Sequence, residues 1–239
     1  MRVWDIHPGY LSQQNLLGEH AEIHALYSII TNNKKGYCHH PETKRWIDKV
    51  DLLILRHNLL VKELTLREFN HHSPLNFLNY PSIGKLENYP WLVDLPSKQL
   101  AILQEKYHKR NQRGRIPLPN FGTEFWAHHK YSVMARGYQY YKEIQNFLSN
   151  RPVFFITDDD ELILKVLDIM KKPITPLALR NVVLHLWGYF KNQATQMEKD
   201  NFFNLYLSSE KIKLLYWLSK KYQKSYLLHS TIFADFLVD

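Results

Sequence analysis

The chain has 239 residues, of which 45% are hydrophobic and 23% charged, values that are ordinary for a globular protein and exclude a disordered or fibrous one. Its 31 Lys and Arg outnumber the 23 Asp and Glu, giving a formal net charge of +8, and aromatic residues reach 14%. Cationic side chains combined with flat stacking surfaces favour a polyanion, nucleic acid first, as the partner.

Cysteine content and hydropathy indicate the cellular compartment in which the protein is expected. Cys38 is the only cysteine, which excludes an internal disulfide and a multi-cysteine zinc or iron–sulfur site and indicates a reducing compartment. No run of about 18 uncharged apolar residues is present, so we expect no membrane-spanning helix. The first ten residues lack the apolar stretch of a signal peptide. We therefore expect a cytoplasmic protein whose first residues belong to the mature fold.

Apolar residues recur at three- and four-residue spacing through most of the chain, which predicts an all-α protein. In the first half, helices are expected over about 11–30 and 42–69, the second with a bend or break at 48–51. Residues 75–93 are rich in Pro, Tyr and Asn and are interpreted as an extended connector. A short helix then begins near Ser97 and ends in the basic stretch 106–115, which is either a phosphate-binding arm or a flexible linker.

The residue pattern of the sequence changes near residue 120. The sequence therefore predicts two helical domains, 1–120 and 121–239. Helices are expected in the second over 124–149, 159–171, 176–192, 196–206 and 209–226. Thr175 followed by Pro176 is typical of a helix cap and a first-turn proline, and Thr195 with Glu198 fits a capping box.

Three segments in the first third carry a family resemblance: MRVWDIHPGYLSQQNLLGEHAEIHALYSII, NNKKGYCHHPETKRW and LRHNLLVKELTLREFNHHSPL. Over residues 1–75 the chain resembles the pyrimidine-dimer DNA glycosylases of endonuclease V type. The resemblance implies a helical DNA-repair glycosylase and AP lyase acting on double-stranded DNA with a damaged pyrimidine or an abasic site. In that family the chain-terminal α-amine attacks C1′, expels the base, forms a Schiff base and cuts the strand by β-elimination, with no metal or organic cofactor.

By the same resemblance, the nucleophile falls on the α-amine of Met1 and the assisting carboxylate on Glu22. An amine must be neutral to attack. An α-amine has a pKa of about 7.7–8.0, against about 10.4 for lysine, so a useful fraction of it is neutral at neutral pH. A carboxylate manages protons at the sugar. Glu19 lies three residues earlier on the same helical face and is the alternative carboxylate.

Several residues are candidates for binding nucleic acid. Arg2 and Gln14 match the family's basic residue beside the nucleophile and a glutamine that enters the first helix. A basic and aromatic group suits phosphate positioning with base stacking, or else is a solvated loop with Trp46 in the core. It consists of Lys34, Lys35, Lys44 and Arg45 with Tyr37 and Trp46 interleaved. Ala21 and Ala25 stand where the family's phage member has phosphate-gripping arginines, so the expectation of dimer recognition is weaker than that of cleavage.

His20 and His24 are four residues apart, with Glu22 between them. The order H-x-E-x-H differs from the HExxH of zinc hydrolases, and spacing dictates no third ligand, so we expect no metal site and assign His20 to phosphate or hydrogen bonding. The doublets His39-His40, His71-His72 and His128-His129 fall near predicted helix ends, where histidine interacts favourably with backbone carbonyls.

The second half has its own resemblance, carried by FWAHHKYSVMARGYQYYKEIQNFL, MKKPITPLALRNVVLHLWGYFKN and LLYWLSKKY. It resembles the DUF1722 domain, whose activity is not established and which elsewhere is joined to a domain associated with thiouracil desulfuration. The resemblance implies modified or damaged bases as a shared theme. The candidate pocket residues are His129, Lys130, Arg180, Asn181 and His185. The alternative is a helix packed through its apolar face with polar groups outside.

Two rival functions stay open at this point. One is a non-catalytic nucleic-acid-binding protein that keeps the fold, which Ala21 and Ala25 favour. The other is an enzyme acting on a modified base, for example a thiolated one, that is free or carried by RNA, with the second domain supplying the pocket. The sequence leaves the oligomeric state open.

Overall fold

The computed structural model describes residues 2–75 and 89–236, and this part of the chain is helical, with no strand. It confirms the predicted all-α class. Two compact units are formed, Met1–Gly114 and Arg115–Asp239, each described here by itself. The sequence placed its boundary near residue 120. No helix in the described ranges is long and apolar enough to cross a bilayer.

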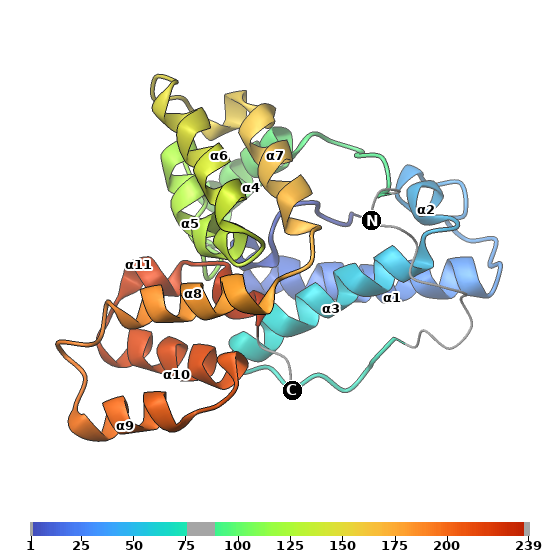
Figure 1. The fold of residues 1–239 in the computed structure, drawn as a ribbon. Coiled ribbons are helices and arrows are strands. Elements are labelled where there is room, and N and C mark those ends of the chain that lie inside the picture. Colours follow the sequence, from blue (N-terminus) through green and yellow to red (C-terminus); the bar gives the residue numbers. More distant parts are fainter. Residues whose placement is uncertain (1, 76–88, 237–239) are drawn as a thin grey trace. The chain divides into compact units, whose positions relative to one another are not determined.

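The first unit contains η1 (Pro8–Tyr10), α1 (Gln13–Thr31), α2 (Pro41–Trp46), α3 (Val50–Leu66) and α4 (Pro96–Arg110). Helices α1 and α3 lie side by side (Figure 1). The helix predicted over 42–69 is two helices, because Asp48 adopts a left-handed conformation with φ 61° between them. Ser12 caps α1 by accepting the Asn15 N–H at 3.3 Å, as Ser at this position favours.

The residues before α1 form an extended segment, buried at Val3 and Ile6. The backbone groups of an extended segment that pairs with no strand must find hydrogen-bond partners elsewhere. Arg56 of α3 donates to the Ile6 carbonyl at 2.9 Å and to Glu19 of α1 at 2.7 and 3.0 Å. Glu19 in turn accepts the Trp4 N–H at 3.1 Å. A buried ion pair therefore ties the start of the chain to α1 and α3.

A second buried arginine fixes the same segment from α2. Arg45 donates to both carboxylate oxygens of Asp5, at 3.0 and 3.1 Å, and to the Val3 carbonyl at 2.8 Å. Its Nε also pairs with Glu42 at 2.5 Å. Gln99 of α4 bonds to both the backbone N–H and the carboxylate of Asp5, each at 2.8 Å. Each of the α-helices α1 to α4 thus contributes a side chain that positions residues 3–6: Glu19, Arg45, Arg56 and Gln99.

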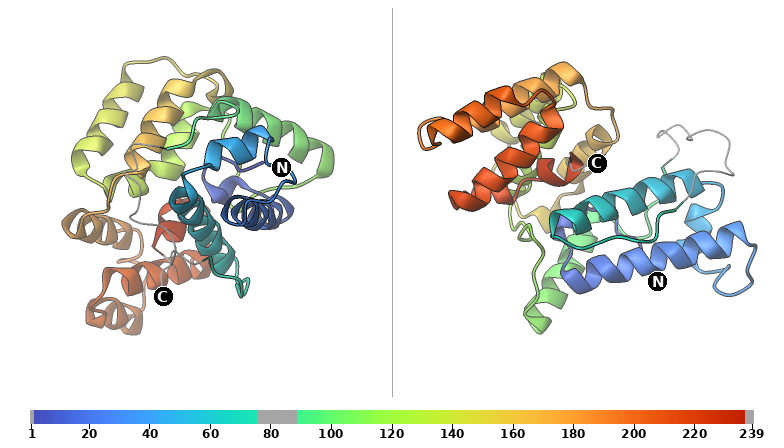
Figure 2. Two further views of the ribbon diagram at one scale, coloured as in Figure 1. Left: turned by 90° about the vertical axis from the view of Figure 1, so that its right-hand side faces the viewer. Right: turned by 90° about the horizontal axis from the view of Figure 1, so that it is seen from below.

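Over residues 115–236, the described part of the second unit, the chain forms η3 (Ile156–Asp158) and eight α-helices. These are α5 (Gly122–Met134), α6 (Tyr138–Ser149), α7 (Asp160–Met170), α8 (Pro176–Trp187), α9 (Gln196–Asn204), α10 (Ser208–Lys221), α11 (Ser225–Leu228) and α12 (Ile232–Asp235). Helix α5 packs against α6, α7, α8 and α12, and α8 packs against α10 (Figure 2).

Local signals explain most of these boundaries. The single helix predicted over 124–149 is split because Gly137, with φ 159°, separates α5 from α6. The predicted caps are confirmed: Thr175 accepts the Ala178 N–H, and Thr195 and Glu198 form a reciprocal capping box at the start of α9. The core of this unit is mainly aliphatic and also contains stacked rings, with those of Trp187 and Phe202 centred 4.1 Å apart.

Replacing Arg56 with Met should destabilise the first unit by about 3–5 kcal/mol, because it leaves the buried Glu19 carboxylate without its counter-ion. Native-state hydrogen exchange of the α1 and α3 amides measures this locally, without assuming that two units unfold in one step. The double variant Glu19→Gln/Arg56→Met removes the stranded charge and should recover part of the loss. If the α1 and α3 amides of the Arg56→Met variant exchange as slowly as those of wild type, the stabilising role assigned to the Glu19–Arg56 pair is wrong.

Glu198 should make the second unit sensitive to acid. Burial raises the pKa of its carboxyl, but hydrogen bonds from Lys221, Thr195 and Tyr222 outweigh burial and lower the pKa to about 2. A carboxyl with a depressed folded-state pKa stabilises the fold above its unfolded pKa of about 4.5, and this contribution disappears as the pH falls toward 2. The stability difference between wild type and Glu198→Gln should therefore shrink over pH 4.5 to 2 in chemical unfolding. The exposed Glu143, changed to Gln, is the control and should show no such convergence.

Candidate active site

The described chain begins beside a carboxylate of α1. The backbone N–H of Arg2 donates to Glu22 Oε2. Met1, the predicted nucleophile, lies outside the described residues. Glu22 is partly exposed, whereas the alternative carboxylate, Glu19, is 2% exposed and is occupied by Arg56 and the Trp4 N–H. Of the two carboxylates considered from the sequence, Glu22 is the one at the start of the chain that solvent and a ligand can reach.

The Arg2 side chain is oriented by residues that precede and begin α4. Its Nη2 pairs with Asp94 at 2.5 Å, and its guanidinium lies 4.9 Å from the centre of the Trp4 ring. Asp94 also pairs with Lys98 at 2.6 Å. The hydrogen bond from Lys98, and then the charge of Arg2, lower the pKa of Asp94. Arg2 Nη1 is buried with no hydrogen-bond partner among the described residues. Neither Asp94 nor Lys98 belongs to a motif that would have singled it out.

A lysine of α4 also belongs to this site. Lys106 Nζ donates to Asn15 Oδ1, and burial lowers the pKa of Lys106, as does nearby Arg110, while the Glu22 carboxylate opposes the shift. Lys106 therefore lies within electrostatic reach of Glu22. It is the first residue of the basic stretch 106–115, which is helical as far as Arg110 rather than a flexible linker. The exposed Gln14 accepts a hydrogen bond from Gln112 at 2.6 Å.

The basic and aromatic group predicted to bind nucleic acid is divided by the fold. Lys34, Lys35 and Lys44 are exposed, as is Tyr37. Arg45 is 1% exposed and its guanidinium is taken up by Asp5, Glu42 and backbone carbonyls. The prediction of a phosphate contact at Arg45 is therefore corrected, because a buried arginine paired in this way presents no donor to a ligand. Trp46 lies in the core and is not available for base stacking.

His20 faces other imidazoles rather than open solvent. Its Nε2 lies 3.1 Å from His71 Nε2, and His24 and His57 complete a group whose potential ligand atoms all lie within 4.8 Å of one another. We call these four residues the histidine cluster. Spacing along the sequence paired only His20 with His24; the packing of α1 on α3 and the return of the chain after α3 bring in His57 and His71. His71 is thus not a histidine at a helix end.

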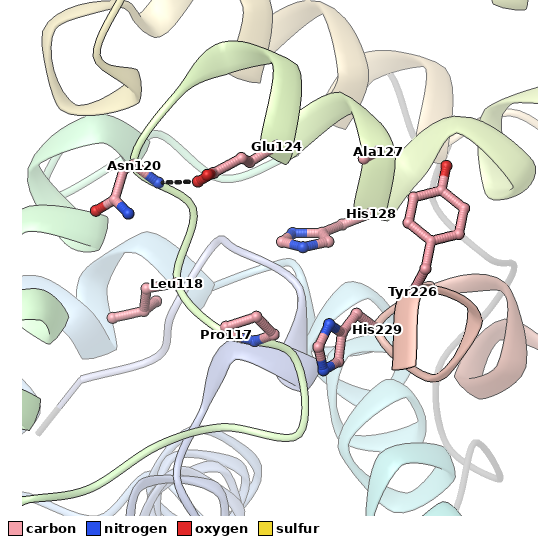
Figure 3. A pocket seen from close by; sticks show the side chains of 8 residues that line it. All are labelled: Pro117, Leu118, Asn120, Glu124, Ala127, His128, Tyr226 and His229. Atoms are coloured by element: carbon pink, nitrogen blue, oxygen red, sulfur yellow. Dashed lines mark hydrogen bonds between the residues drawn. The ribbon is translucent and has the colours of Figure 1, made fainter. Parts of the chain in front are cut away.

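The second unit has a pocket of about 310 Å³ between the segment before α5, α5 itself and the region of α11 (Figure 3). Glu124 accepts the Asn120 N–H at 2.7 Å along one wall. The His128 and His229 rings are perpendicular, with centres 6.2 Å apart. The complete lining is Pro117, Leu118, Asn120, Glu124, Ala127, His128, Tyr226 and His229.

The five residues predicted to line a second-domain pocket do not line this one. His129 is 1% exposed, with its ring against Phe125, because it occupies the buried face of α5. Lys130 lies over the Tyr131 and Tyr226 rings. The other three, Arg180, Asn181 and His185, are exposed on α8, since its buried face is taken by residues such as Val182 and Leu186. Helix α8 therefore packs through its apolar face with its polar groups outside, which is the alternative stated from the sequence.

Two family models match the chain, one in its N-terminal part and one in its C-terminal part. Residues 1–77 match the family model described as pyrimidine dimer DNA glycosylase, and residues 130–236 match that of a protein of unknown function, DUF1722. No curated protein and no solved structure matches the chain significantly. The chain thus combines an N-terminal domain of the pyrimidine dimer DNA glycosylase family with a C-terminal domain of the DUF1722 family.

Proposed function

We propose that the first unit is a DNA glycosylase and AP lyase for damaged pyrimidines, with the α-amine of Met1 as nucleophile and Glu22 as the assisting carboxylate. The observation that carries the proposal is the hydrogen bond from the Arg2 backbone N–H to Glu22. Covalent geometry keeps an α-amine within about 4 Å of the next backbone nitrogen. The family match over 1–77 supports the reaction class.

Glu22 is suited to move protons at the sugar. The neutral amine attacks C1′, the C1′–N bond breaks, and its electron pair leaves with the base, which takes a proton from water. The proton lost by the attacking nitrogen passes to the Glu22 carboxylate, which returns it to O4′ as the sugar ring opens to the Schiff base. Loss of a C2′ proton then expels the 3′ phosphate, and water hydrolyses the imine to release the enzyme. Positioned proton transfer of this kind contributes about 10²–10⁴-fold to a rate.

Nearby cations support both the nucleophile and the DNA contact. Lys106 lies within electrostatic reach of Glu22, and Arg2 directly follows residue 1 in the chain; positive charge of this kind disfavours protonation of an adjacent amine. The Arg2 side chain is 34% exposed, so its guanidinium can donate to a phosphate oxygen. The duplex is expected to present an extruded nucleotide, as enzymes that process bases require.

Borohydride should trap a covalent adduct between the untagged full-length protein and an abasic duplex, because reduction converts the Schiff base into a stable amine. Peptide mass mapping should locate the adduct at the α-amine of residue 1. Glu22→Gln should lower the rate of strand cleavage by about 10²–10⁴-fold. The same assay on a dimer-containing duplex tests base release.

Two matched variants make this experiment decisive. Extending or acetylating the N-terminus should abolish the adduct while leaving duplex binding intact. Lys106→Met tests the other amine near Glu22 and should leave the adduct in place. An adduct that maps to Lys106, or that survives acetylation, overturns the assignment to Met1. Duplex binding with no adduct on any substrate favours the non-catalytic rival, in keeping with the exposed, uncharged Ala21 and Ala25 on α1.

The exposed lysines after α1 are expected to contact phosphate. Each phosphate contact contributes about 0.9 to the slope of log binding constant against log salt concentration. Lys34→Ala/Lys35→Ala should therefore weaken duplex binding and reduce that slope by about 1–2, measured by fluorescence anisotropy over a salt series. The exposed pair Lys142 and Lys213 of the second unit, changed to Ala, is the control. Equal losses in the two double variants would show diffuse attraction rather than contacts at Lys34 and Lys35.

A further inference from the structure

The histidine cluster is assembled from three parts of the first unit. His20 and His24 are one turn apart on α1, so they share a face, and His57 lies on α3, which packs against α1. His71 follows the end of α3, where Glu68 adopts a left-handed conformation with φ 67° and the Phe69 N–H bonds back to the Leu64 carbonyl at 3.0 Å. This reversal returns the chain to α1.

The rings are arranged around a common centre. Five of the six ring pairs have centres between 4.6 and 5.1 Å apart. Four imidazoles that bind one tetrahedral ion at 2.0–2.1 Å through nitrogen would have ring centres about 5 Å apart and nitrogens about 3.3 Å apart. The nitrogen separations of the cluster, 3.1 Å for His20 and His71 and at most 4.8 Å overall, need only a small inward adjustment.

His57 provides an independent indication of a ligand. Its side chain is 1% exposed, and its Nδ1 lies 3.1 Å from Asn58 Oδ1, an atom that can only accept, so Nδ1 carries the proton. The lone pair is therefore on Nε2, which is buried; the Ser73 backbone lies near the ring, but no group among the described residues bonds to Nε2 with normal hydrogen-bond geometry. A buried imidazole whose outer nitrogen donates to an amide oxygen is oriented as metal-binding histidines are.

Burial disfavours the charged form of the four imidazoles. Burial, together with neighbouring imidazoles, lowers the pKa of His20 to about 4, and burial lowers the pKa of His57 to about 4 against the hydrogen bond to Asn58. Burial also lowers the pKa values of His24 and His71. Neutral imidazole is the form in which histidine binds a metal ion.

We propose that His20, His24, His57 and His71 form a binding site for one Zn²⁺ ion. Imidazole nitrogen suits late first-row metals, and Zn²⁺ accepts the tetrahedral set that four nitrogen ligands provide. Four protein ligands fill such a site, which makes the ion structural rather than catalytic. It holds the segment after α3 against α1, the helix that also carries Glu22. Ser73, whose Oγ lies 3.5 Å from both His24 and His71, belongs to the surroundings of the site.

The test is a zinc titration of untagged full-length protein after EDTA treatment and its removal, in competition with a chromophoric chelator. Wild type should bind one Zn²⁺ per chain, and X-ray absorption should show a nitrogen shell at about 2.0–2.1 Å without sulfur. The partly exposed ligands give the safest variants: His24→Gln and His71→Gln should each weaken binding about a hundred-fold or more. His72→Gln, next to His71 in sequence but outside the cluster, should bind as wild type does.

Folding is checked separately by far-UV circular dichroism of every variant in EDTA, which should overlay that of wild type in EDTA. Zinc bound with equal affinity by wild type and His71→Gln overturns the site, as does failure of wild type to bind Zn²⁺ below about 10 µM. Loss of binding in His72→Gln but not in His71→Gln also overturns it, since the ion would then lie elsewhere.

The zinc site does not rest on the proposed glycosylase activity, and the two can fail separately. Stoichiometric zinc in a protein that gives no borohydride adduct upholds the site and rejects the activity. An active enzyme that binds no zinc rejects the site alone.

Discussion

The buried pair of Glu19 and Arg56 is the interaction on which the first unit depends. An extended segment buried against helices cannot satisfy its own backbone groups, so side chains must do so. Glu19 and Arg56 bond to each other and to the backbone at Trp4 and Ile6. Because this pair fixes the residues that lead back to Arg2, the position of the chain start relative to Glu22 follows from it.

Helix α1 serves three different purposes because its successive residues point in different directions. Glu19 faces the core, and Glu22, three residues later and on nearly the same side, meets the Arg2 backbone. His20 and His24 share a neighbouring face that meets α3. The candidate catalytic carboxylate and two of the proposed zinc ligands, His20 and His24, therefore lie on one helix, which keeps the two sites in a constant relation.

Different interactions stabilise the interior of each unit. In the first, several charged side chains are buried and paired, which is energetically demanding and tolerates few alternative arrangements. They are Asp5, Glu19, Glu42, Arg45, Arg56 and Glu63. The core of the second is mainly aliphatic, with stacked rings such as Trp187 and Phe202. A paired network of this kind suits a domain that must hold an extended chain start in one place, which apolar packing alone specifies less strictly.

The sequence by itself determined the helical class, the helix caps at Thr175 and Thr195, and the break near Asp48, because these depend on local periodicity and on side chains within one turn. It also determined the family of the N-terminal third. The family resemblance already favoured Glu22 over Glu19. Only the tertiary structure decided that Glu19 is buried and paired with Arg56, that Arg45 is a core residue, and that His57 and His71 join His20 and His24. These outcomes depend on contacts between residues 15 to 51 positions apart along the chain, as in Trp4 with Glu19 and His20 with His71, and no short-range pattern encodes them.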